Sequence, residues 1–204
     1  MARHFTLLAI AVIAAALTSL TIVLRAQNMS TKVPYRANGQ EATLVGTIRF
    51  SGKTPRPLLI DTSADPACKT YLPELTAEWV VIRDGRLLNV LVYATGTLLD
   101  DHSFEPTSSP AVLAHINCRY RPHMLGMQVG QTLNIINVDN TENNTHPTPK
   151  FNPEWNRKQM PGSPPITKTF NRAEVAIPFK DNQHPWKEAY VAIFTHPFFA
   201  VSDS

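Results

Sequence analysis

Apolar residues fill the beginning of the chain almost without interruption. Residues 5–24 contain no charged side chain and follow a short positive leader. A run of this length is close to the roughly 20 residues that cross a bilayer core, and it is longer than the apolar region of an ordinary signal peptide. The pattern predicts an N-terminal apolar helix within residues 1–26 that directs export. It is either a cleaved signal peptide or an anchor retained in the inner membrane, and the protein is expected in the periplasm or another extracytoplasmic space.

Beyond this run, apolar residues come in short segments instead. Residues 27–41 are polar and predict a linker, and residues 42–204 are enough for one domain with its own core. In that domain no segment keeps a helical period for more than about two turns, whereas apolar and polar residues often alternate. Strands are expected at 43–50, 58–61, 79–82, 87–93, 111–117, 131–137, 167–170, 174–179 and 189–194. Short strands at this spacing predict an all-β fold, an antiparallel β-sandwich.

Turn residues support this interpretation. Asp84-Gly85 lies between two predicted strands and favours a tight hairpin turn. Proline accounts for 17 of the 204 residues, which disfavours long helices. Residues 140–165 are rich in proline and asparagine, and they are predicted to form a long loop that is either functional or loosely ordered.

Charge and cysteine content narrow the function classes. The formal net charge of +3 becomes +1 when Arg3 and Arg25 are removed with the leader, so nucleic acid is not an expected partner. In an oxidising compartment, Cys68 and Cys118 are most simply explained as a disulfide. Free buried thiols are the alternative. Neither cysteine has the local spacing of a zinc or redox site.

Several segments in the second half of the chain carry a recognisable pattern. They are residues 118–123, 128–137, 139–146, 184–190 and 196–203. In order and spacing they resemble the cupredoxin-like proteins of bacterial envelopes, which are often called plastocyanin-like or methylamine-utilisation-like. The resemblance implies a Greek-key β-sandwich with a type 1 copper site in the ancestral form.

The copper ligands implied by the resemblance are mostly replaced in this chain. The histidine, cysteine, histidine and methionine of the pattern fall on Asn143, Asp181, His184 and Lys187. A type 1 site needs a soft thiolate, two imidazoles and a weak axial ligand, and of these only His184 is kept. We therefore expect no copper here, and we hypothesise that Asp181 and Lys187 fill the former site as an ion pair or a hydrogen-bonded cluster.

Two other interpretations of the site residues stay open. His123, His146 and His184, together with Asp181, offer ligands that suit zinc or copper, although histidines next to prolines at turns also serve as hydrogen-bond partners of loops. Trp155 and Trp186 are candidates for an aromatic surface that binds a sugar or a protein, although tryptophan in a sandwich more often packs against the core.

The sequence thus favours a non-catalytic binding or structural module of the cell envelope that has lost its type 1 copper site. Its expected partner is another envelope protein, its contact with the membrane is through the N-terminal segment, and no cofactor is expected. The working surface is expected at the 140–165 loop and the corner at 181–186. A metal-binding protein with copper or zinc, or a copper carrier, is one alternative, and a carbohydrate-binding module is another. An enzyme is not expected, because no nucleophile–base or metal–base set is present in neighbouring motifs.

Overall fold

The computed structural model describes residues 32–69 and 75–203. The chain divides into two compact units, residues 1–33 and residues 34–204, and almost all described residues belong to the second unit. The predicted apolar helix at 5–24 lies outside the described residues. Among those described, no helix is long and apolar enough to span a membrane.

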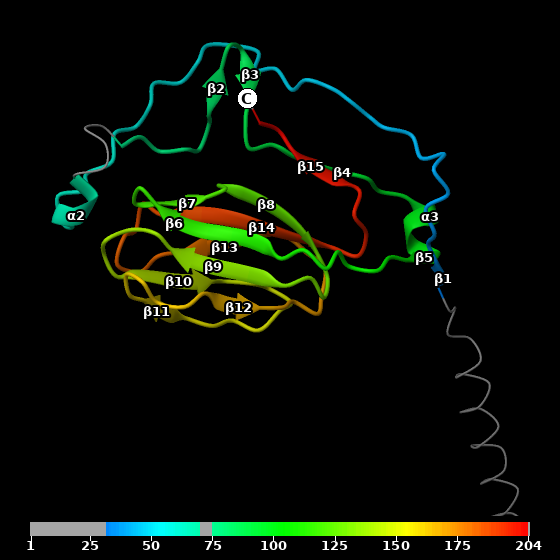
Figure 1. The fold of residues 1–204 in the computed structure, drawn as a ribbon. Helices are drawn as coiled ribbons and strands as arrows, with labels where there is room; N and C mark the ends of the chain where they lie inside the picture. Colours follow the sequence, from blue (N-terminus) through cyan, green and yellow to red (C-terminus); the bar gives the residue numbers. More distant parts are fainter. Residues whose placement is uncertain (1–31, 70–74, 204) are drawn as a thin grey trace, which may run out of the picture. The chain divides into compact units, whose positions relative to one another are not determined.

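Two sheets form the centre of the second unit (Figure 1). The five-stranded sheet has the order β11 (Arg157–Gln159), β10 (Asn143–Pro147), β13 (Glu174–Lys180), β14 (Glu188–Phe194) and β8 (Met124–Gln128). The four-stranded sheet has the order β12 (Ile166–Lys168), β9 (Leu133–Asn137), β6 (Ala111–Ile116) and β7 (Arg119–Arg121). The predicted β-sandwich is thereby confirmed.

The core lies between these sheets because their strands alternate apolar and polar residues. Leu113 of β6 and Ile135 of β9 are buried, and they belong to one cluster with Ile177, Phe179 and Val191 of the other sheet. Alternation with a period of two places such residues on one face of each strand. The burial of this apolar face stabilises the pairing of the two layers.

The sheets are mixed rather than purely antiparallel. β14 runs parallel to β8, and β6 runs parallel to β9, whereas the remaining pairs of the sandwich are antiparallel. Parallel neighbours require a crossover connection, which local alternation does not reveal. The chain between the two strands of each parallel pair supplies this connection.

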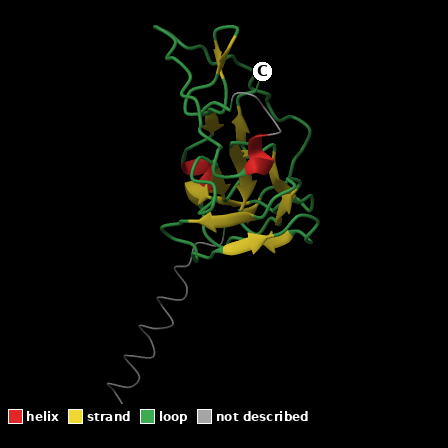
Figure 2. Ribbon diagram, turned by 90° about the vertical axis from the view of Figure 1, so that its left-hand side faces the viewer, coloured by secondary structure: helices red, strands yellow, loops and turns green. Residues whose placement is uncertain are grey.

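Short elements complete the described structure, and helix is confined to two single turns (Figure 2). These elements are β1 (Val33–Pro34), α2 (Pro66–Lys69), β2 (Ile82–Arg83), β3 (Arg86–Leu87), β4 (Leu91–Tyr93), α3 (Thr97–Asp100), β5 (His102–Ser103) and β15 (Phe199–Val201). β2 and β3 form a hairpin, and β4 pairs with β15. Asp84 and Gly85 have φ of 51° and 74°, as a two-residue hairpin turn of the expected type requires.

Several sequence predictions were wrong in the details of the strands. Residues 58–61 form a single bridge, between Leu59 and Thr76, and of residues 79–82 only Ile82 is in a strand. Residues 87–93 are divided between the end of β3 and β4. Residues 43–50 are not a strand, since their pairing is limited to a single bridge between Arg49 and Arg86, and Leu44 and Val45 are 94% and 85% exposed. Residues 140–165 are not one long loop, because they contain β10 and β11. The strands predicted at 111–117, 131–137, 167–170, 174–179 and 189–194 are confirmed, with ends that shift by at most two residues.

Candidate functional site

The predicted disulfide is confirmed and connects a surface segment to the sandwich. Cys68 in α2 and Cys118, in the turn between β6 and β7, are bonded with a Cα–Cα distance of 5.6 Å. Asn117 and Cys118 both have positive φ, 52° and 54°, so the chain reverses sharply at this point. The bond holds Asp65, three residues before Cys68, close to His184 at one end of the sandwich.

Asp181 organises the loop between β13 and β14. Its side chain is buried, and its Oδ1 accepts hydrogen bonds from the backbone N–H groups of Gln183 at 2.9 Å and His184 at 3.1 Å. Aspartate commonly binds the backbone two or three residues ahead in this way. The turn is closed by the N–H of Lys187, which donates to the carbonyl of His184 at 2.8 Å.

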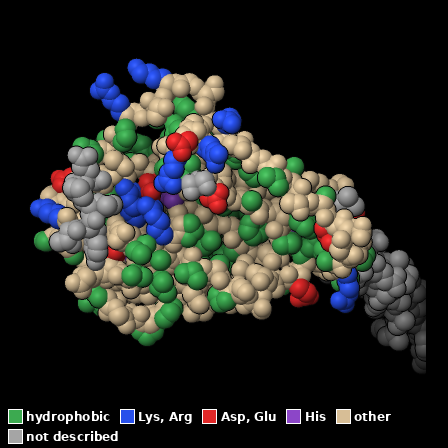
Figure 3. Space-filling model, turned by 45° about the horizontal axis from the view of Figure 1, so that its top comes forward, with side chains coloured by type: hydrophobic (Ala, Val, Ile, Leu, Met, Phe, Trp, Pro, Cys, Tyr) green, Lys and Arg blue, Asp and Glu red, His purple; other side chains and the backbone are tan. Residues whose placement is uncertain are grey.

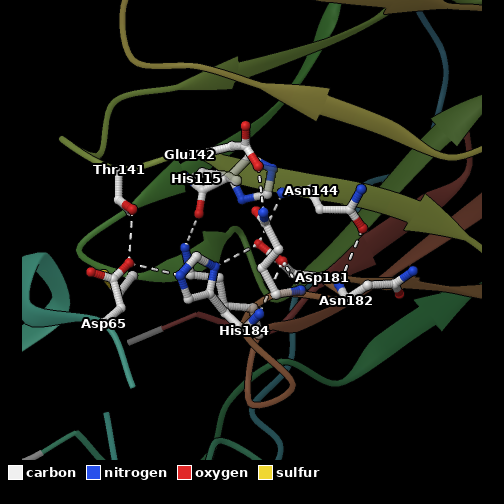
Figure 4. A network of polar contacts seen from close by, with 12 residues as sticks. Asp65, His115, Thr141, Glu142, Asn144, Asp181, Asn182 and His184 are labelled. Carbon is white, nitrogen blue, oxygen red and sulfur yellow. Dashed lines mark hydrogen bonds and ion pairs between the residues drawn. The ribbon is translucent and has the colours of Figure 1, made fainter. Parts of the chain in front are cut away.

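The ring of His184 lies between two carboxylates (Figure 4). Its Nδ1 is 3.1 Å from Oδ2 of Asp181, and its Nε2 is 2.8 Å from Oδ2 of Asp65. The hydroxyl of Thr141 also donates to Asp65, at 2.8 Å. With a carboxylate oxygen at each nitrogen, the geometry favours the imidazolium, which has two N–H donors.

Electrostatics agree with this geometry. Burial favours the neutral imidazole, but the hydrogen bonds to Asp181 and Asp65 outweigh it and raise the pKa of His184. Burial also opposes ionisation of the carboxylates, yet hydrogen bonds from Thr141 and His184 lower the pKa of Asp65. The hydrogen bonds from His184 and the backbone of Asn144 lower the pKa of Asp181 in the same way. The three groups therefore stabilise each other in their charged forms.

Lys187 is the centre of a second cluster. Its Nζ is fully buried, lies 3.1 Å from Oδ2 of Asp139 and also donates to Oδ1 of Asn143. Burial lowers the pKa of Lys187, and the charge of Asp139 opposes this shift. Asn143 donates through Nδ2 to Asn137 at 2.7 Å and to Asp139 at 3.2 Å, and Oδ1 of Asp139 accepts the N–H of Cys118 at 3.0 Å.

The structure brings the four positions that the resemblance matches to copper ligands into one buried region. Asn143, Asp181, His184 and Lys187 are all buried. Of the two arrangements hypothesised for Asp181 and Lys187, a direct ion pair is not formed, because Lys187 contacts Asp139 and Asp181 contacts His184. Each residue instead belongs to a hydrogen-bonded cluster. The clusters adjoin through the backbone of Asn144, whose N–H donates to Asp181 at 3.1 Å.

The other candidate histidines have separate partners. His123 contacts the carbonyl of Glu188 at 3.0 Å, and His146 contacts Asn182 at 3.2 Å and Glu154 at 2.7 Å. His123 therefore contacts the start of β14, whereas His146 contacts loop residues.

The described ranges contain one group of three residues whose ligand atoms all lie within 4.8 Å of one another, namely Asp65, Cys68 and His184. Its sulfur belongs to the disulfide and is no thiolate, and both nitrogens of His184 already contact carboxylates. The group is better described as part of the hydrogen-bond network than as a set of metal ligands.

The two candidate tryptophans are each half-buried and packed against their own part of the sandwich. The ring of Trp155 meets Phe179 edge-on, with centroids 6.3 Å apart, and Nζ of Lys168 lies 5.0 Å from its centroid. Trp186 donates from Nε1 to the carbonyl of Cys118 at 3.1 Å. These contacts are those of packing residues at the rim of the core.

Sequence reasoning missed three residues of the site: Asp65, Asp139 and His115. His115 is fully buried in β6, and its Nε2 is 2.9 Å from the hydroxyl of Thr145. Burial, together with the nearby charge of Lys187, lowers the pKa of His115 to about 3, so it is neutral. Asp139 belongs to a motif that the sequence singled out and was a detectable candidate. Asp65 comes from a distant segment that the disulfide attaches to the sandwich.

No protein-family model matches the sequence, and no curated protein matches it. Among solved structures, the chain is similar to a copper-containing nitrite reductase from Thermus scotoductus, with a TM-score of 0.38 and 15% identity over 44% of this chain and 25% of that chain. It thus spans about a quarter of the reductase. It is also similar to a mutant of amicyanin in the Cu(I) state, with a TM-score of 0.37 and 22% identity over 44% of this chain and 86% of that chain.

A purple cupredoxin from Nitrosopumilus maritimus is similar as well, with a TM-score of 0.36 and 19% identity over 41% of this chain and 98% of that chain. These structures are cupredoxins, the group that the sequence motifs resemble. Similarity at this level concerns the arrangement of strands and says nothing about metal, substrate or activity.

Proposed function

We propose that this protein is a non-catalytic binding module of the cell envelope whose former type 1 copper position is closed by the protein's own charged groups. The observation that carries the proposal is the saturation of the four former ligand positions. The polar side-chain atoms of Asn143, Asp181, His184 and Lys187 are each bonded to another protein group.

The donor set does not fit a type 1 copper ion. Such a site takes thiolate, imidazole and a weak thioether, whereas these positions hold an amide, a carboxylate, an imidazole flanked by carboxylates and an ammonium group. The only thiols of the chain, Cys68 and Cys118, are joined in the disulfide. The ammonium of Lys187 repels a second cation, and in a buried place this repulsion is strong.

Export supports a role in the envelope. The apolar run at 5–24 predicts delivery across the inner membrane, and a disulfide is stable in an oxidising compartment. We propose that the domain acts there by binding another protein.

The test of the copper proposal is a comparison of the exported domain with a variant in which the soft ligands are restored. Wild-type protein without a histidine tag is incubated with Cu²⁺, passed through a desalting column and analysed for metal and visible absorption. We expect substoichiometric copper and no blue band. The variant Asn143→His/Asp181→Cys/Lys187→Met is expected to acquire thiolate-to-copper absorption, and Lys187→Met alone serves as its control. A blue band or one tightly held copper per chain in the wild type would refute the proposal.

A further inference from the structure

Beside the β2–β3 hairpin, the second unit has a surface where exposed arginines lie near exposed apolar side chains. Arg86 lies opposite Arg83 in the hairpin and also forms a bridge with Arg49 of the preceding segment. Residues that are directly opposite in antiparallel strands project from the same face. Arg49, Arg83 and Arg86, here called the arginine triad, therefore share one face of this ribbon.

The charge of the arginine triad exceeds that of Asp84, the exposed carboxylate in the turn of the same hairpin. All three side chains are exposed, and none forms an ion pair with another described residue. Like charges directly opposite each other destabilise a pair of strands. A ligand with negative charge relieves this repulsion, which makes the triad a suitable contact for an anionic group.

An apolar groove adjoins the triad. It has a volume of about 540 Å³ and is lined by residues 54–58 and 76–82. Trp79, at its side, is 76% exposed, and Leu58 and Val80 are exposed as well. Figure 3 shows basic side chains projecting next to hydrophobic ones on the face that includes the hairpin. Large exposed apolar side chains in a groove with a charged rim are typical of protein interfaces.

The neighbouring segment 43–47 has the sequence pattern of a strand but no partner strand among the described residues. Its alternation predicts a strand, and Ile48 and Phe50 are half-buried while Arg49 between them is exposed, as that alternation requires. Residues 43–47 pair with no strand in the described part of the chain, and Leu44 is 94% exposed. A segment with the pattern of a strand and no partner is suited to pair with another chain.

We propose that this groove and the arginine triad form the docking site for an acidic segment of a partner protein that also carries apolar side chains. Carboxylates of the segment contact the triad, and an apolar side chain packs against Trp79 in the groove. This inference deepens the proposed binding function and rests on it, because it names the surface and the chemistry of the partner.

Charge complementarity selects this occupant over a second copy of the chain. The carboxylate that lines the groove, Glu78, is already paired with Arg119 at 3.1 Å and with Arg121 at 2.6 Å. The same surface of a second copy offers three arginines and one exposed carboxylate, Asp84 of the hairpin turn, so like charges outnumber opposite ones and disfavour self-association. A lipid bilayer is disfavoured because its surface presents no side chain of defined shape to fill a groove.

The experiment uses a fluorescein-labelled peptide that alternates glutamate with leucine and phenylalanine, and fluorescence anisotropy with the exported domain. Two further peptides have glutamine or lysine in place of glutamate. We expect saturable binding of the glutamate peptide alone, weakened by added salt because the contacts are exposed. The variant Arg49→Gln/Arg83→Gln/Arg86→Gln is expected to lower the affinity by about tenfold or more, and Trp79→Ala by about 30-fold.

The matched control is Lys150→Gln/Arg172→Gln/Lys180→Gln, which removes the same charge from exposed positions of the sandwich and should leave the affinity unchanged. Equal binding of all three peptides, or an equal loss with the control variant, would overturn the inference. The inference would also be overturned if vesicles of phosphatidylglycerol and phosphatidylcholine bind through Arg49, Arg83 and Arg86 while the glutamate peptide does not bind. Metal content of the same preparation is measured in parallel, so failure of the docking site is distinguishable from failure of the copper proposal.

Discussion

Replacement of Lys187 by methionine tests whether the buried charge pair holds the site together. Methionine has nearly the length of lysine and keeps most of its packing, so the main loss is the ammonium charge. The carboxylate of Asp139 is then left in a place where both side chains are 0–1% exposed. Removing one partner of a buried ion pair typically costs about 3–5 kcal/mol, because the remaining charge stays uncompensated.

The size of the effect can be read from thermal unfolding. For a domain of this size, 1 kcal/mol corresponds to roughly 2–4 °C in Tm, so Lys187→Met should lower Tm by roughly 6–20 °C. Asp139→Asn should cost a similar amount, because it leaves the ammonium unpaired. In the double variant neither charge remains, and we expect it to be more stable than either single variant. Circular dichroism with the disulfide intact gives the free energies of unfolding for the cycle.

The exposed Lys180 on β13 provides the control, since Lys180→Met should change the stability by no more than about 0.5 kcal/mol. A cost of less than about 1 kcal/mol for Lys187→Met would contradict this role of the ion pair, and so would a double variant that loses the sum of the two single effects. The first result would mean that water reaches the ammonium group. The second would mean that Lys187 and Asp139 act independently.

Three further predictions follow from other contacts. The pKa of His184 is raised from 6.5 in the folded state. Its contribution to stability is therefore complete below pH 6.5 and is lost as the pH rises through the pKa of the folded state. His184→Gln should remove this pH dependence, which is measured by urea unfolding at a series of pH values. Cys68→Ser/Cys118→Ser opens a loop of 50 residues and should cost about 4 kcal/mol, seen as a lower urea midpoint than that of the oxidised wild type. Glu174 accepts N–H groups of residues 150–152, so Glu174→Ala should cost about 3 kcal/mol and speed hydrogen exchange there, whereas unchanged exchange would contradict that role.

The apolar alternation predicted the strands whose side chains form the core. It failed where the buried side chains of a strand are polar. β6, β9, β13 and β14 alternate because one face meets the other sheet. β10 was missed because Asn143, Asn144 and Thr145 are buried in it together with Pro147, and such residues are typical of loops in a sequence. The strand predicted at 43–50 has the right pattern but no second strand beside most of it.

The sequence predicted some residues of the site but not the hydrogen-bond partners of those residues. Resemblance to a ligand pattern identified Asn143, Asp181, His184 and Lys187, which are joined in the buried network. It could not identify their partners. Lys187 pairs with Asp139, and His184 reaches Asp65 in a segment 119 residues earlier. Such pairings depend on the tertiary fold and leave no periodic signal along the chain.

The positive charge of Lys187 gives a physical reason why the loop between β13 and β14 can keep its shape in the proposed function. In a copper site, one cation binds residues from several strands to each other. Here the ammonium of Lys187 connects the end of that loop to Asp139 and Asn143, and His184 connects it to Asp65. Charge-assisted hydrogen bonds of this kind are stronger than neutral ones and fix geometry. A cation that belongs to the chain does not depend on metal supply or redox state, which suits a protein that binds a partner rather than one that transfers electrons.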